Sequence, residues 1–154
     1  MSRTKATTHD SGLEREKVFS LRFIVSLLLM AAGIAWIAFQ YTVVRVDPSD
    51  LDGKPGGPAW MSDIGLWSYT IGFALLFIGL AVSAHPSTPL GRGRGVVVGM
   101  LSCFLLGMVW ICVFYIFQGT SLDKIWVMND LGNYNILVGI GFMAVGFSFA
   151  TKWE

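Results

Sequence analysis

Four long apolar blocks, separated by polar segments, dominate the chain of 154 residues. They cover roughly residues 21–44, 66–84, 95–117 and 134–151, and their interiors contain no Asp, Glu, Lys, Arg or His. Each block is close to the roughly 20 residues that a helix needs to cross about 30 Å of hydrocarbon. The first block is longer than the apolar core of a secretory signal, so we interpret it as a retained span. The pattern predicts an all-α integral membrane protein with four transmembrane helices.

Glycines recur at the same spacing in the second and the fourth block. Two trios with seven-residue steps lie 67 residues apart, namely Gly65, Gly72 and Gly79, and Gly132, Gly139 and Gly146. The first and third blocks match as well, because Gly33 and Trp36 align with Gly107 and Trp110. Self-similarity of this kind sets the architecture of a chain. We therefore expect one two-span unit that is present twice.

The repeat divides the chain into a tail at 1–17, a first repeat at 18–86, a linker at 87–94 and a second repeat at 95–154. The tail is rich in Ser, Thr and charged residues, so we expect it to be disordered and cytoplasmic. Because each repeat has two spans, both repeats enter the membrane in the same direction. The prediction is two tandem parallel helical hairpins that are related by a pseudo-twofold axis along the membrane normal.

Positive charges and aromatic residues predict the orientation. Eight Lys and Arg residues lie in the tail and first span start, the linker region and the C-terminus, whereas three lie in the other two connections. Cytoplasmic flanks carry an excess of Lys and Arg, so both termini are predicted to be cytoplasmic. Amphipathic side chains near span ends act as interfacial anchors. The expected anchors are Trp60, Trp67, Trp126 and Tyr134 at the outer ends, and Lys152 and Trp153 at the inner end.

The glycine trios predict close helix packing. Steps of seven residues drift by only about 20° per heptad, so each trio forms an almost straight stripe along one face. In lipid, close packing against small residues is a main source of helix association. Glycine is also simply frequent in membrane spans, but the matched positions favour a groove. We expect each groove to receive the preceding span of the same copy, and we expect Trp36 and Trp110 to pack inside the membrane beside Gly33 and Gly107.

Side chains that carry chemistry form no recognisable active site. Cys103 and Cys112 are nine residues apart on one predicted helix, on opposite faces, and cannot pair with each other. No nucleophile-base constellation, phosphate-binding loop or metal-ligand cluster is visible. We therefore expect no enzyme activity, no cofactor and no metal. The net charge of +1 gives no indication of nucleic-acid binding.

The second copy carries motifs that point to a known family. They are Gly107-x-x-Trp110, the run Asp130-Leu131-Gly132-Asn133-Tyr134-Asn135, the spaced glycines Gly139, Gly141 and Gly146, and the ending Ala150-Thr151-Lys152-Trp153. With these motifs the chain resembles the CrgA family of small actinobacterial cell-division membrane proteins. The resemblance covers about residues 94–154 well and 17–86 more loosely.

The resemblance implies a non-enzymatic role at the division septum of the cell membrane. Its implied partners are the lipid bilayer, other divisome membrane proteins and the septal peptidoglycan synthases, and its implied action is to regulate or recruit septum formation. It implies no catalytic residues. This chain departs from the family by carrying two copies of the unit. The fused pair suggests either a covalent version of a family homodimer or a first copy that has diverged to bind something else, and homo-oligomers of the whole chain remain open.

A small four-helix transporter or passive channel is the alternative function. Coupled carriers usually need an ionisable group inside the membrane, and the interiors of the four blocks contain none. The polar side chains on offer there are Ser26, Gln40, Thr70, Ser102, Asn135 and Ser148. This set weighs against ion-coupled transport and leaves a passive pore open.

Overall fold

The computed structural model describes residues 20–46, 51–54 and 56–151, and within them the chain forms helices and no strand. Four long helices are α1 (Leu21–Phe39), α3 (Leu66–Ser83), α4 (Arg94–Phe117) and α6 (Asn135–Ala150). Shorter ones are η1 (Gln40–Val44), α2 (Ala59–Asp63), η2 (Pro89–Gly91), η3 (Leu122–Lys124), α5 (Met128–Leu131) and η4 (Gly132–Tyr134). The expected disordered tail lies outside the described residues.

Four helical segments are long and apolar enough to cross a membrane: Leu21–Val44, Leu66–Ser83, Arg94–Phe117 and Met128–Ala150. The prediction of an all-α chain with four such helices is therefore confirmed. The first segment reaches its length because the π-helical η1 continues α1 without a break. Single π-helical turns are rare and occur mostly inside or at the end of α-helices.

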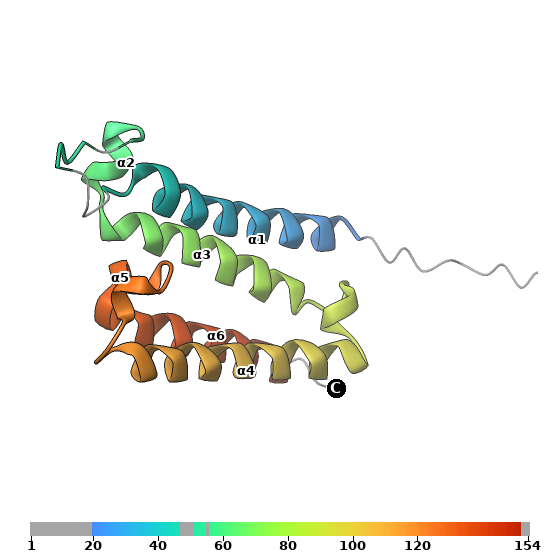
Figure 1. Cartoon of the computed structure of the whole chain (residues 1–154). Coiled ribbons are helices and arrows are strands. Elements are labelled where there is room, and N and C mark those ends of the chain that lie inside the picture. Colours follow the sequence, from blue (N-terminus) through green and yellow to red (C-terminus); the bar gives the residue numbers. More distant parts are fainter. Residues whose placement is uncertain (1–19, 47–50, 55, 152–154) are drawn as a thin grey trace, which may run out of the picture.

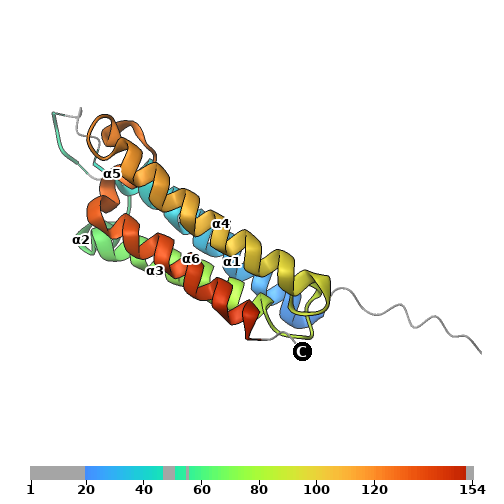
Figure 2. The same ribbon diagram turned by 90° about the horizontal axis from the view of Figure 1, so that it is seen from below.

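The long helices pack in two pairs. α1 lies along α3, and α4 lies along α6, while α3 makes the lighter contact with α6. Figure 1 shows α1 and α4 running in the same direction, with the short helices α2 and α5 gathered at one end of the bundle. Seen from below, α4 lies in front of α1 and α6 in front of α3 (Figure 2). The beginning of α1 and the end of α6 thus lie at the opposite end from α2 and α5.

The apolar core lies where the two pairs meet. One cluster of buried side chains combines Ile37, Tyr69 and Phe73 of the first repeat with Val127, Leu131, Val138 and Phe142 of the second. Another cluster, toward the opposite end, combines Ala84 with Val96, Cys103, Val145 and Phe149. Both clusters therefore contain side chains of both repeats.

The pairs do not meet through equivalent positions. Phe73 of α3 is 7% exposed, whereas its counterpart 67 residues later, Ile140 of α6, is 50% exposed. In the opposite sense, Val138 of α6 is 6% exposed and its counterpart Ile71 is 41% exposed. A twofold axis would bury both members of each pair, because an isologous contact uses the same patch twice. The expected pseudo-twofold relation is therefore wrong; the aromatic side chains that α3 turns toward α6 have no aromatic counterparts in α6.

Candidate functional site

The first helix pair crosses at two glycines. A Cβ atom on Gly33 would lie 2.6 Å from the carbonyl oxygen of Gly72 and 2.8 Å from the backbone nitrogen of Leu76. Nearer the other end, a Cβ atom on Gly79 would lie 2.9 Å from the carbonyl oxygen of Ser26. Only hydrogen fits at these places, so the backbones of α1 and α3 are in direct contact. Such contact gives the dispersion energy that pairs helices in lipid.

The second pair crosses in the same way. A Cβ atom on Gly107 would lie 2.6 Å from the carbonyl oxygen of Gly139, and one on Gly139 would lie 2.3 Å from Cγ1 of Ile111. Gly146 is less crowded, because the nearest atoms are ring carbons of Phe104 at 3.3 Å. In both copies the second and third glycines of the trio thus face the preceding span of the same copy.

The first glycine of each trio lies outside the groove. Gly65 and Gly132 have φ angles of +49° and +48°, and no heavy atom comes within 4 Å of a Cβ built on either. Gly65 directly precedes α3, and Gly132 begins η4 just before α6. Both adopt a backbone conformation that side chains other than glycine rarely tolerate. The expectation of a groove of three glycines is wrong at these positions, because the seven-residue spacing runs past the start of the helix into the turn.

Each pair also has an indole hydrogen bond at the same place. Trp36 Nε1 donates to the carbonyl oxygen of Ser68 at 3.0 Å and to its Oγ at 3.1 Å, and that hydroxyl donates to Gln40 Oε1 at 2.9 Å. In the second copy, Trp110 Nε1 donates to Asn135 Oδ1 at 3.2 Å. Ser68 and Asn135 are equivalent and fully buried. A polar residue at matched positions in two apolar blocks was the signal for this contact, which the expectation of simple packing missed.

A polar cluster ties the first copy to the second at the end of the bundle that holds α2 and α5. Arg45 Nε lies 3.0 Å from Asp130 Oδ1, and Tyr69 Oη donates to Asp130 Oδ2 at 2.7 Å. The guanidinium of Arg45 also lies 4.7 Å from the ring centroid of Tyr41, which in turn contacts the ring of Trp126 edge-on. Two residues of the first copy therefore hold one carboxylate of the second. None of these contacts was predicted from the sequence.

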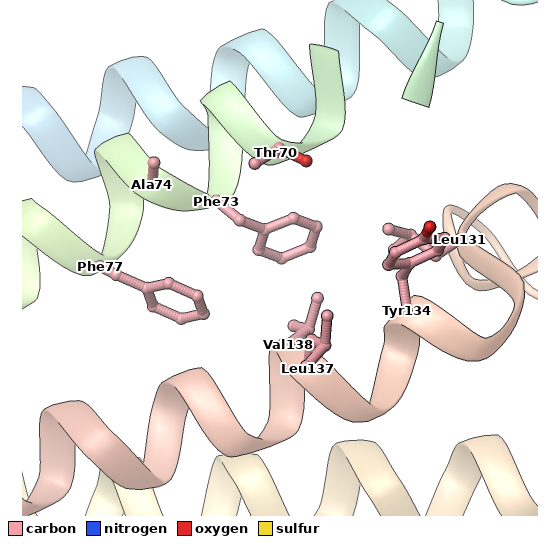
Figure 3. A pocket seen from close by; sticks show the side chains of 8 residues that line it. All are labelled: Thr70, Phe73, Ala74, Phe77, Leu131, Tyr134, Leu137 and Val138. Atoms are coloured by element: carbon pink, nitrogen blue, oxygen red, sulfur yellow. The ribbon is translucent and has the colours of Figure 1, made fainter. Parts of the chain in front are cut away.

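Small apolar cavities flank the contact between α3 and α6. One of about 200 Å³ is lined by Phe73 and Phe77 of α3 and by Leu137 and Val138 of α6, among others (Figure 3). Another, of about 190 Å³, has Trp110 and Phe142 in its wall. Across residues 20–46, 51–54 and 56–151, no three His, Cys, Asp or Glu side chains are placed to hold a metal ion.

Four of the six expected interfacial anchors lie in the part of the chain that the structure describes. Four aromatic side chains are exposed and lie in or beside α2, α5 and the adjoining starts of α3 and α6, namely Trp60, Trp67, Trp126 and Tyr134. Trp60 also leans on Trp36, with ring centroids 6.0 Å apart. Lys152 and Trp153 lie outside the described residues. An anchoring role for these six residues stays a prediction.

Comparisons with a family model and with individual proteins point to the same family. The family model described as cell division protein CrgA matches residues 2–85 and 88–154. A cell division protein CrgA from Streptomyces avermitilis is 45% identical over 65 residues, which are 42% of this chain and 71% of that protein. No solved structure matches the chain.

Two further relatives carry the same name. One from a Mycobacterium species is 34% identical over 55 residues, and one from Corynebacterium glutamicum is 32% identical over 60 residues. These segments cover 36% and 39% of this chain, and the chain spans about half, 54%, of the length of either relative. Because the family model covers nearly the whole sequence, in two consecutive segments, the chain belongs to the CrgA family of cell division proteins.

Proposed function

We propose that the chain is a non-enzymatic membrane scaffold at the division septum. In this role it binds other divisome membrane proteins and the septal peptidoglycan synthases, and it regulates or recruits septum formation. The observation that carries the proposal is membership in a family of cell division proteins, combined with four apolar helices whose polar groups serve helix contacts.

The use of the polar side chains supports a scaffold over a catalyst. Ser68, Gln40 and Asn135 are buried and engaged in hydrogen bonds within their own helix pair. Asp130 and Arg45, which carry charge close to the core, neutralise each other. Groups committed in this way stabilise one arrangement of helices, whereas a catalytic group must face a substrate. The glycines at the helix crossings then allow the paired helices to pack closely.

The proposal includes an orientation with both termini in the cytoplasm. Nη1 of Arg22, at the start of α1, lies 3.0 Å from Nδ1 of His85, beyond the end of α3, so these two segments meet at one end of the bundle. Arg92 follows η2 and Arg94 begins α4, which starts at the same end of the bundle as α1 (Figure 1). An excess of positive charge marks the cytoplasmic side. A fusion of alkaline phosphatase at Lys54 is expected to be active, and one after residue 154 inactive; the reverse pattern would contradict the orientation.

Localisation is the first test of the septal role. A fluorescent protein fused to the cytoplasmic N-terminus is expected to give a band at the division site of growing cells, and deletion is expected to change septum spacing or timing. The matched variants are Gly107→Ala, which inserts a methyl group into a crowded crossing, and Gly119→Ala, where nothing lies within 4 Å. The band is expected to weaken only in the first. A uniform peripheral signal without a division phenotype on deletion would refute the proposal.

Binding of the synthases is the second test. The tagged full-length chain, solubilised from membranes in a mild detergent, is expected to retain septal peptidoglycan synthases. Retention is expected to fall with Gly107→Ala and to persist with Gly119→Ala, because only the former disturbs the second helix pair. Synthases that appear equally with an unrelated four-span protein carrying the same tag would show that the retention is unspecific.

A further inference from the structure

The contact between the two repeats is an interlocking one. The ring of Phe77 on α3 lies over Gly141 on α6, where a Cβ atom would come 2.5 Å from ring carbon Cε2. The same ring meets Phe142 edge-on, with centroids 5.1 Å apart. Figure 3 shows Phe73 and Phe77 directed from α3 into the space between the two helices. Phe77 is therefore a knob, and the missing side chain of Gly141 is the hole that receives it.

The counterparts of knob and hole are both alanines. Phe77 corresponds to Ala144 on α6, and Gly141 corresponds to Ala74 on α3, in both cases 67 residues away. Both alanines are exposed, and Ala74 also lies in the wall of the cavity beside the α3–α6 contact, next to Phe73 and Phe77 (Figure 3). The contact is thus heterologous: the knob face of the first copy meets the hole face of the second. The hole face of the first copy and the knob face of the second copy remain on the outside.

A heterologous contact between equivalent units can continue into rings or open filaments unless something stops it. In this chain the outer hole face on α3 includes Ile71, Ala74 and Ile78, and the outer knob face on α6 includes Ile140 and Ala144. A second copy of the chain would meet these two faces if the contact continued. In such a contact the position of the hole would carry the methyl group of Ala74, and the position of the knob would carry Ala144 in place of a phenylalanine.

The outer faces also lack the polar groups of the inner contact. Arg45 and Tyr69, which bind Asp130, correspond to Gly119 and Ile136 in the second copy. Neither of these has a charged or hydroxyl group that could bind Asp63, the counterpart of Asp130. Apolar area alone gives little net attraction between helices in lipid, so the outer faces lack the features that make the inner contact specific.

We propose that Phe77 and Gly141 are the specificity determinants of a head-to-tail contact between two-span units, and that Ala74 and Ala144 cap the pair. The partner that the two outer faces would bind is a second copy of the same chain. The two alanines prevent this copy from docking. The chain is then a closed pair of units, independent of which divisome proteins it binds.

The test introduces a glycine hole and a phenylalanine knob on the outer faces of the full-length chain. Both native cysteines are replaced by alanine, and reporter cysteines are placed at Ile71 and Ile140. Their counterparts, Val138 and Phe73, line the same cavity inside the molecule. A short bifunctional thiol reagent, applied to native membranes, then links chains wherever the outer faces meet.

The reporter chain with its natural alanines is expected to stay a monomer on a denaturing gel. Ala74→Gly combined with Ala144→Phe is expected to give a ladder of linked chains, and Ala144→Phe alone is expected to give none, because its ring meets the methyl group of Ala74. A ladder with the natural alanines, an equal ladder with the knob alone, or no ladder with both substitutions would overturn the proposal.

A second reporter pair checks the inner contact in the same background. Cysteines at Phe73 and Val138 are expected to link within one chain and to shift its mobility. Gly141→Leu is expected to abolish most of this link, and Phe77→Ala added to Gly141→Leu is expected to restore it, because the leucine then occupies the space of the ring. An unchanged link with Gly141→Leu alone would overturn the role of the hole, whatever the ladder shows.

Discussion

Gly33→Ala is the smallest change that tests the packing of the first helix pair. The added methyl carbon would lie 2.6 Å from a backbone oxygen and 2.8 Å from a backbone nitrogen of α3. Neither atom can rotate away as the end of a flexible side chain can. To reach ordinary contact at 3.4 Å, α1 and α3 must separate by 0.8 Å at this point.

The expected cost follows from this separation. A radial gap of roughly 0.5–1 Å forfeits about a quarter to a half of the dispersion energy of each affected contact. Overpacking a tight interior typically costs about 1–3 kcal/mol. Alanine recovers up to about 1 kcal/mol of helix propensity relative to glycine. We therefore expect Gly33→Ala to lower the free energy of unfolding by up to about 2 kcal/mol.

The matched control is Gly146→Ala, the same chemical change inside another span. The closest atoms are ring carbons of Phe104 at 3.3 Å, and a side chain can move by the required amount. This variant is expected to be neutral or more stable by up to about 1 kcal/mol. Titration of the purified chain in mild-detergent micelles with sodium dodecyl sulfate, followed by circular dichroism, measures both. Equal shifts in the two variants would refute the argument from backbone contact.

Three further changes have definite outcomes in the same assay. Trp36→Phe removes the indole donor and is expected to cost about 0.6–1.7 kcal/mol, whereas Trp67→Phe, at an exposed ring, is expected to cost less. Gly65→Ala and Gly65→Leu are expected to cost about 1–3 kcal/mol each, and equally, because the strain lies in the backbone; a strong dependence on side-chain size would contradict this. Asp130→Asn is expected to cost about 1–3 kcal/mol and Asp63→Asn almost nothing; similar losses would refute the polar cluster.

The helices were predictable because each is specified locally. A run of about 20 apolar residues has to satisfy its backbone hydrogen bonds within itself in lipid, and a helix is the only single segment that does so. The described helices accordingly coincide with the apolar blocks, from Leu21–Val44 to Met128–Ala150. The small helices α2 and α5 were not predicted, since a single turn in a polar connection has no comparable signal.

The glycine pattern was informative only in part. Gly72, Gly79 and Gly139 lie in crowded crossings, where a side chain would meet the neighbouring helix. Gly65 and Gly132 have the same spacing, but they serve the turn, because their φ angles are positive. Spacing along a sequence cannot distinguish a need for space from a need for backbone freedom, since glycine answers both.

The sequence by itself determined the four helices that are apolar enough to cross a membrane and part of the glycine contacts within each copy, because those features depend on local composition and on neighbouring spans. Only the tertiary structure decided how the copies meet. The repeat predicted a symmetric contact, yet Phe77 fits over Gly141 while their counterparts are exposed alanines, and Asp130 is held by Arg45 and Tyr69. The face that one helix turns toward another depends on the fit of side chains far apart in the chain, and a few substitutions between copies are enough to change it.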